Sequence, residues 1–190
     1  MGTSAMLYII DRGETRIAAL TSTDAYPDGM GADLLQFISN RKNLRMLREA
    51  LPRCLPLDQA SKDHLIGCRT AESNRYIESH PEYLYMQGVH MLRDLISSEG
   101  EVRVWNRFDD RRYDDWAYVI DFDRNTFEVY KGMSGVPVPE GERFHDPAGA
   151  DAKGIHPFKE VAVFDMDDLP SSPEFVSVCS ERERPMLEEE

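Results

Sequence analysis

The segment from Thr23 to Gly31 holds the residues whose types and spacing are best suited to chemistry. Asp24 and Tyr26 stand two positions apart, and in an extended segment such residues point to the same side of the backbone. A carboxylate there can take up or release a proton, and a phenol can donate a hydrogen bond to developing negative charge. We therefore predict Asp24 and Tyr26 as the catalytic residues. The alternative is an ordinary turn, in which Asp accepts backbone N–H groups and Tyr packs its ring.

The residues around this pair predict a loop of fixed shape. Pro27 fixes its own φ and favours extended geometry at Tyr26, while Gly29 and Gly31 permit a positive φ or a close approach of the backbone. Further residues of this loop, and the start of an aromatic strand downstream, are predicted to contact a substrate. These residues are Thr23, Met30, Asp115, Trp116 and Tyr118.

Other arrangements that could carry chemistry are incomplete. The acidic run around Arg111 and Arg112 could hold a cation, but such runs are more often solvated turns. The segment from Asp121 resembles the opening of a calcium loop, but Thr126 and Gly132 stand where Gly and Glu are required. No phosphate-binding loop or dinucleotide fingerprint is present. We expect no cofactor.

Two cysteines and two histidines are of the types that bind zinc, but their spacing matches no compact zinc motif. The residues concerned are Cys54, His64, Cys68 and His80. A thiolate paired with a histidine base is the other reading of the same residues. We expect no bound metal.

Composition limits the remaining choices. The chain has 190 residues, of which 41% are hydrophobic, enough for one sizeable core. Its net charge is −13, with 22 acidic and 11 basic residues in 101–190, so nucleic acid is not an expected partner. Three cysteines without framework spacing, and the lack of a long apolar stretch, predict a cytoplasmic protein with no membrane partner. The oligomeric state is left open.

The pattern of apolar residues predicts an α+β domain over residues 1–170. We expect an antiparallel sheet of five to six strands with three helices packed mainly on one face, and an acidic, flexible tail over 171–190. The expected strands are 5–10, 15–21, 102–108, 116–122, 127–130 and 158–164. The expected helices lie near 34–38, near 44–51 with Asn43 as N-cap, and from Pro81 to Gly100, with a short one around 58–66. Residues 132–157 are expected to form a long loop that is either a lid or disordered.

Several of these residues also match a family pattern. Met1-Gly2-Thr3, followed by Asp24, Tyr26, Pro27, Gly29 and Gly31, resembles an uncharacterised family of fungal and bacterial proteins. Its members share a signature like Trp-Asp-Gly-Tyr-Pro-x-Gly-x-Gly, and the likeness spans most of residues 1–130. The chain departs from that pattern at Thr23, Ala25 and Met30. The resemblance implies no reaction, fold or cofactor.

Two functional hypotheses follow from these residues. The first is a small-molecule-processing enzyme of the hydrolase, lyase or isomerase type, in a specialised pathway, with the 23–31 loop as its site. The second is a noncatalytic module whose acidic surface recognises a basic protein or peptide. Loss of turnover without loss of stability on changing Asp24 and Tyr26 would favour the enzyme.

Overall fold

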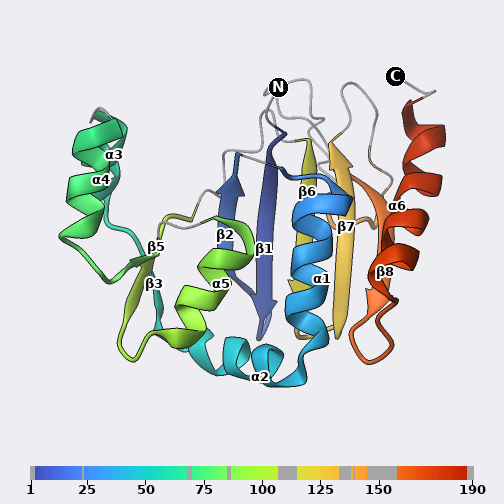
Figure 1. Cartoon of the computed structure of the whole chain (residues 1–190), viewed down its shortest axis with the longest axis horizontal. Helices are drawn as coiled ribbons and strands as arrows, with labels where there is room; N and C mark the ends of the chain where they lie inside the picture. Colours follow the sequence, from blue (N-terminus) through green and yellow to red (C-terminus); the bar gives the residue numbers. More distant parts are fainter. Residues whose placement is uncertain are drawn as a thin grey trace.

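A computed structural model describes residues 3–22, 24–67, 70–84, 87–106, 115–132, 138, 140–144 and 158–187. Its main feature is a five-stranded sheet with the strand order β2-β1-β6-β7-β8 (Figure 1). The strands are β1 (Ala5–Asp11), β2 (Glu14–Thr21), β6 (Trp116–Asp121), β7 (Thr126–Gly132) and β8 (Phe158–Asp165). The α+β class is confirmed.

The sheet is mostly antiparallel, as expected, but one parallel pair of strands makes it mixed. Its β1–β2, β6–β7 and β7–β8 pairs are antiparallel, but β1 and β6 run parallel, with Ala5 opposite Trp116. A parallel pair requires a long crossover between its strands, and the helices between β2 and β6 provide one. The strands expected at 5–10 and 15–21 form a hairpin, with positive φ at Arg12 and Gly13 in its turn.

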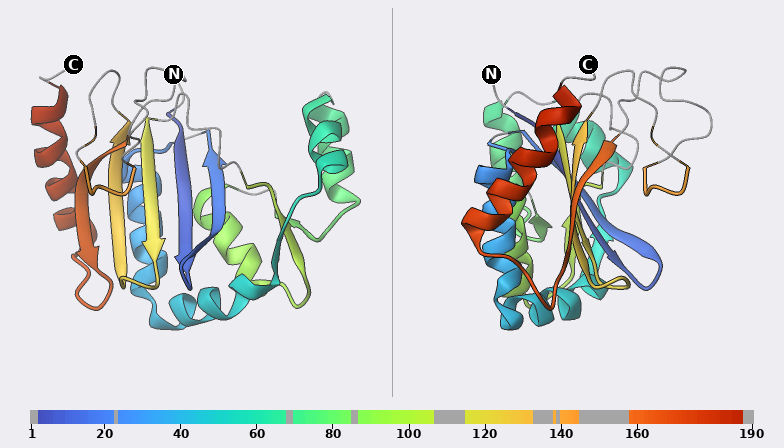
Figure 2. Two further views of the ribbon diagram at one scale, coloured as in Figure 1. Left: turned by 180° about the vertical axis from the view of Figure 1, so that it is seen from behind. Right: turned by 90° about the vertical axis from the view of Figure 1, so that its right-hand side faces the viewer.

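Helices cover one face of this sheet. The views in Figures 1 and 2 place α1 (Ala32–Ser39), α5 (Gly88–Ser97) and α6 (Ser172–Leu187) on that face. The helix α2 (Arg41–Ala50) follows α1, and its N-cap is Asn40, whose side chain accepts from the Lys42 amide, rather than the expected Asn43. The described part of the chain contains six α-helices, so the expected number of three is wrong. No helix in the described ranges has the length and apolarity to cross a membrane.

A smaller unit stands beside the main sheet (Figure 1). It consists of a parallel three-stranded sheet in the order β3-β5-β4 and two helices. Its elements are β3 (Cys54–Pro56), α3 (Gln59–Gly67), α4 (Thr70–Glu78), β4 (Tyr83–Leu84) and β5 (Val102–Val104). The helix expected from Pro81 therefore begins at Gly88, because Tyr83 and Leu84 pair with β5 instead.

The C-terminal segment also differs from expectation. Residues 172–187, which we expected to form a flexible tail, form α6, and its Phe175 and Cys179 are fully buried in the core. Ser171 caps this helix together with Glu174, whose carboxylate accepts from both the amide and the hydroxyl of Ser171. The apolar side of α6 is therefore part of the core that supports the sheet.

Alternation along the strands divides the core into two parts. Leu7 and Ile9 face the helices, while Met6 and Tyr8 belong to a smaller cluster on the opposite face of the sheet. Phe144 packs on this second cluster, with its ring centroid 4.8 Å from that of Tyr130 and 5.4 Å from that of Tyr8. Both faces of the sheet are therefore covered where β1, β6 and β7 run side by side.

Candidate functional site

The predicted site loop leads directly into α1, the first of the helices that cover the main sheet. Residues Pro27–Gly31 form a wide helical turn, and α1 continues from it. The Met30 amide donates to the carbonyl oxygen of Asp24 at 3.0 Å, and the Gly29 amide donates to that of Tyr26 at 3.1 Å. These bonds fix the backbone on both sides of Pro27.

The two glycines of the loop serve close approach rather than positive φ. A Cβ at Gly29 would lie 2.7 Å from both the carbonyl oxygen and Oδ1 of Asp24, so the Asp24 side chain lies directly against this glycine. A Cβ at Gly31 would lie 3.0 Å from ring carbons of Tyr118 and Phe175. The residue with a positive φ is Asp24 itself, at 50°. Non-glycine residues adopt this conformation infrequently, although Asp is among those that tolerate it.

The predicted catalytic residues both face solvent. Asp24 is exposed and Tyr26 is 48% exposed, while Ala25 between them is fully buried. The alternation means that the loop turns Ala25 inward and presents the carboxylate and the phenol on its outer side. Thr23, a predicted substrate contact, lies outside the described residues.

The other predicted substrate contacts lie beneath the loop or beside it. Met30, Trp116 and Tyr118 are buried on the helix-covered face of the sheet. The Tyr118 hydroxyl donates to the carbonyl oxygen of Ala25 at 2.8 Å. Burial, with further contributions from Cys179 and nearby acids, raises the pKa of Tyr118 well above its ordinary value, so this phenol stays protonated as a donor. Tyr118 therefore holds the loop from its buried side.

Asp115 has a structural partner of its own. Its side chain is exposed, and its Oδ2 accepts from the Ser4 amide at 2.9 Å. The Asp115 and Trp116 amides in turn donate to the Ser4 carbonyl oxygen. Asp115 therefore joins the start of β6 to the residue before β1. The acidic run that precedes it, residues 107–114, lies outside the described part of the chain.

The structure adds an ion pair that the sequence did not indicate. Lys131 of β7 lies 3.3 Å from Glu183 of α6, and its ammonium is 4.6 Å from the ring centroid of Trp116. Glu183 was missed because its segment was expected to be a flexible tail. Two buried atoms on this face, Nε1 of Trp116 and Oγ1 of Thr21, have no hydrogen-bond partner among the described residues. The helix-covered face of the sheet therefore carries both an ion pair and unsatisfied polar atoms.

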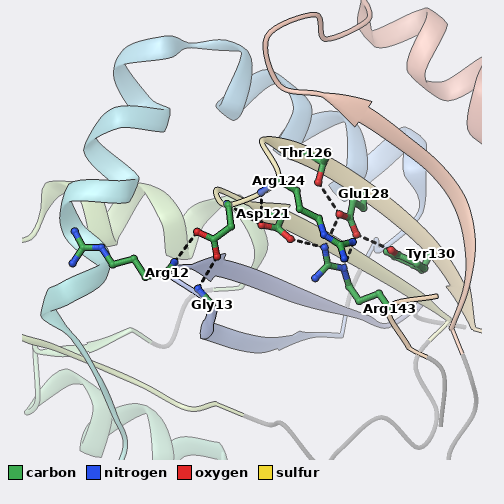
Figure 3. Close-up of polar contacts among 9 residues, drawn as sticks. Arg12, Gly13, Asp121, Arg124, Thr126, Glu128, Tyr130 and Arg143 are labelled. Carbon is green, nitrogen blue, oxygen red and sulfur yellow. Dashed lines mark hydrogen bonds and ion pairs between the residues drawn. The ribbon is translucent and has the colours of Figure 1, made fainter. Parts of the chain in front are cut away.

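A second cluster of charged side chains lies on the opposite face of the sheet (Figure 3). Arg143 makes two 2.7 Å bonds to the carboxylate of Glu128 and also bonds to Asp121. Tyr130 and Thr126 donate to the same Glu128 carboxylate at 2.6 and 2.7 Å. Burial acts to raise the pKa of Glu128, but the bonds from Arg143, Tyr130 and Thr126 outweigh it, so the pKa is lowered. Arg143, Tyr130 and Thr126 thus all donate to carboxylates within the protein.

The turn that resembles a calcium loop uses its carboxylates to hold backbone instead. The amides of Asp123 and Arg124 donate to Oδ1 of Asp121, and the Asp123 carboxylate accepts from the amides of Arg12 and Gly13 (Figure 3). These bonds join the β1–β2 turn to the β6–β7 turn. Among the described residues, no group of three or more His, Cys, Asp or Glu side chains is placed to hold a metal ion.

The residues considered for zinc or thiol chemistry are dispersed. Burial raises the pKa of the Cys54 thiol to about 11 and that of Cys179 to about 12, which disfavours the reactive thiolate. His64 and His80 both lie beside the ring of Tyr76. Cys68 falls outside the described residues. Of the long loop expected over 132–157, the structure describes residues 132, 138 and 140–144.

A comparison with models of known families, with curated proteins and with solved structures finds no match to this chain.

Proposed function

We propose that this protein is a small-molecule-processing enzyme that uses acid–base chemistry at residues 24–31. Asp24 takes or gives the proton, and the Tyr26 hydroxyl donates a hydrogen bond to the negative charge that develops on the substrate. The observation that carries the proposal is the outward presentation of these two side chains from a loop that is fixed from within at Ala25.

The backbone at Asp24 supports this reading. Its φ of 50° is held by the Met30 amide, which bonds its carbonyl oxygen, and its side chain lies against Gly29. Non-glycine residues held in such conformations are concentrated at functional sites, where rigid surroundings maintain them. A carboxylate held this way presents its lone pairs in a constant direction, which proton transfer requires.

The buried residues receive a supporting role in the proposal. Tyr118 fixes Ala25 through its hydroxyl, and Met30 and Trp116 pack in the core on the same face of the sheet. In this arrangement they set the position of Asp24 and Tyr26, while the substrate contacts the exposed side chains of the loop. The specificity of the enzyme then depends on the outer surface of residues 24–31.

The proposal is tested by removing each chemical group with little change in shape. The full chain and the variants Asp24→Asn and Tyr26→Phe are incubated with an extract of small metabolites, and consumption is followed by mass spectrometry. We expect a compound consumed by the native protein to be consumed roughly 100-fold more slowly by each variant, with little change in melting temperature.

Asp28→Asn is the matched control, because Asp28 is an exposed acid of the same loop that has no part in the proposed chemistry. It should retain activity. If the native protein and Asp24→Asn consumed the compound at the same rate, the proposed reaction would not take place at this loop.

A noncatalytic binding module is the second candidate function, and the distribution of charge favours it. Residues 101–190 hold 22 acidic and 11 basic side chains, an excess that attracts a basic peptide at low salt. Titration with a lysine-rich peptide at two salt concentrations tests this candidate. Binding that weakens steeply with salt, together with no turnover of any metabolite, would favour the module over the enzyme.

A further inference from the structure

A cleft of about 550 Å³ lies on the smaller unit, away from the loop at residues 24–31, and is lined by His64, Glu72, Arg75 and Tyr76. Its volume falls within the range of small-molecule sites, about 300 to 1,000 Å³. Helix α3 contributes His64, and α4 contributes the other three residues. The proposed acid–base reaction uses none of them.

A row of four aromatic rings forms one side of this region. The ring centroids of His64 and Tyr76 are 4.1 Å apart, those of Tyr76 and His80 are 4.3 Å apart, and those of His80 and Tyr83 are 4.8 Å apart. Such spacing is typical of packed aromatic pairs. The row begins at the half-buried Tyr83 and reaches the cleft at Tyr76 and the exposed His64. A flat ligand can pack against the rings at this end.

Hydrogen bonds beneath the row hold the rings in place. The Ser61 hydroxyl donates to Asp58 at 3.0 Å, so the Tyr83 hydroxyl, 2.9 Å from Ser61, donates to Ser61 in turn. The Tyr76 hydroxyl also donates to Ser61, which is buried. Both phenols are thus directed inward, and the cleft receives the ring of Tyr76 rather than its hydroxyl.

His80 is fixed in the same way. Its Nδ1 lies 2.7 Å from the Tyr76 carbonyl oxygen, an atom that can only accept, so Nδ1 carries a proton. The bond ties the imidazole of His80 to the backbone of the helix that carries Tyr76. Two of the four rings are therefore anchored to α4, the helix that also supplies the charges of the cleft.

The charged residues of the cleft determine which ligand fits. Glu72 and Arg75 are three residues apart on α4, a spacing that places them on the same side of the helix, and both are exposed. A guanidinium binds carboxylate and phosphate groups through two parallel hydrogen bonds. A ligand with one anionic group can reach Arg75 while its flat part contacts Tyr76 and His64.

We infer that this cleft binds a small planar molecule that carries a carboxylate or a phosphate group. Arg75 binds the anionic group, and the rings of His64 and Tyr76 pack against the planar part. The two anions share the same recognition chemistry, and the test below separates them.

The test uses benzoate and phenyl phosphate as probes of the full chain, with binding followed by NMR of the histidine and tyrosine ring protons. We expect saturable shifts at His64 and Tyr76, and the probe with the lower dissociation constant identifies the preferred anion. The Arg75→Gln variant should bind that probe roughly tenfold more weakly or worse. Arg75→Lys keeps the charge and should bind with intermediate affinity.

The matched controls concern charge and shape. Arg45→Gln changes an exposed helix arginine on α2, outside the cleft, and should bind the probe as the native chain does. Benzylamine has no anionic group for Arg75 and should not displace the preferred probe, and cyclohexanecarboxylate lacks a flat ring and should bind more weakly. Absence of saturation up to roughly 10 mM of either probe would overturn the inference, as would unchanged affinity in Arg75→Gln. Equal binding of cyclohexanecarboxylate would overturn the assignment of a planar ligand.

Discussion

The phenol of Tyr118 donates a 2.8 Å hydrogen bond to the carbonyl oxygen of Ala25, a residue 93 positions earlier in the chain. Tyr118 belongs to β6, the middle strand of the main sheet, and is fully buried. The bond connects the middle strand of the sheet to the loop that presents Asp24 and Tyr26. One buried hydroxyl therefore ties the candidate site to the sheet.

Replacement of Tyr118 by Phe should loosen this loop without changing its surface. The change leaves the buried carbonyl oxygen of Ala25 without its hydrogen-bond donor. We therefore expect the free energy of unfolding, measured by urea denaturation, to fall by about 1–3 kcal/mol. Hydrogen exchange at the Met30 amide should accelerate. Tyr26→Phe removes an exposed hydroxyl and should leave stability nearly unchanged. A Tyr118→Phe variant as stable and as protected as the native chain would contradict this account of the loop.

Replacement of Gly29 by Ala should destabilise the protein through a steric clash. The new Cβ would lie 2.7 Å from the carbonyl oxygen and from Oδ1 of Asp24, so the loop must shift. The expected loss of stability is about 1–3 kcal/mol, measured by urea unfolding. Gly100→Ala is the control, because nothing lies within 4 Å of a Cβ there, and it should be neutral or slightly stabilising. Similar effects of the two changes would show that Gly29 is not closely packed.

Replacement of Arg143 by Leu should be strongly destabilising at neutral pH. It leaves the carboxylates of Asp121 and Glu128 buried without their cation, and breaking such a group costs about 3–5 kcal/mol. Arg143→Lys keeps a charge but loses the paired bonds, so its loss should be smaller.

The pH dependence of this variant follows from the lowered pKa of Glu128. A carboxyl whose pKa is lower in the folded state stabilises the fold above its unfolded value of 4.5, and this contribution is lost as the pH falls through the folded value. The stability gap between the native chain and Arg143→Leu should therefore narrow when urea unfolding is repeated under acidic conditions. If the difference in stability between the native chain and Arg143→Leu did not change with pH, the ion pair with Glu128 would not be its cause.

Replacement of Glu160 by Gln should stabilise the protein at pH 7. Burial, and then the charges of Glu142 and Glu128, raise the pKa of Glu160 above its ordinary value of 4.5. A carboxyl with a raised pKa costs stability when it is ionised, and this cost disappears as the pH falls below the folded value. The melting temperature of Glu160→Gln should exceed the native value at pH 7 and match it in acid. The control is Glu101→Gln at an exposed position, which should change the melting temperature little at either pH.

Replacement of Phe175 by Ala tests whether α6 belongs to the core. Phe175 is fully buried, with ring centroids 5.8 Å from Phe127 and 5.4 Å from Phe164. We expect Phe175→Ala to lower the free energy of unfolding, measured in urea, by about 3–5 kcal/mol, and Phe175→Leu to lower it less. A flexible tail would tolerate both changes, so a small effect of Phe175→Ala would show that α6 does not pack in the core.

Local signals predicted the parts of the fold that depend on local geometry. The turn at Arg12 and Gly13, the alternation in β7 and the apolar spacing in α1 and α2 all correspond to elements of the structure. The parallel pairing of β1 with β6 was not predictable in this way, because it joins residues more than 100 positions apart and has no local pattern. The start of α5 was misplaced for a related reason, since Tyr83 and Leu84 form a strand only through their pairing with β5.

One local signal for α6 was present and was outweighed by composition. Ser171 and Glu174 have the spacing of a capping box, and Phe175 follows at once. The acidic and proline-containing sequence favoured a tail instead. The loop at residues 24–31 was predicted as a fixed turn, but its support from Tyr118 could not be, because Tyr118 reaches it through tertiary packing alone. The role of Arg143 was also hidden, since its partners Glu128 and Asp121 lie 15 and 22 positions earlier and meet it only in the folded sheet.

The place of β1 inside the sheet has a consequence for biosynthesis. During translation β1 and β2 leave the ribosome first and can close into a hairpin at once. The second edge of β1 remains unpaired until Trp116 and the rest of β6 have been made, because Ala5 pairs with Trp116. An apolar strand with one open edge is exposed to wrong partners throughout that interval. We therefore expect the nascent chain to depend on chaperones until β6 has been synthesised, and refolding from denaturant to be slow for a domain of this size.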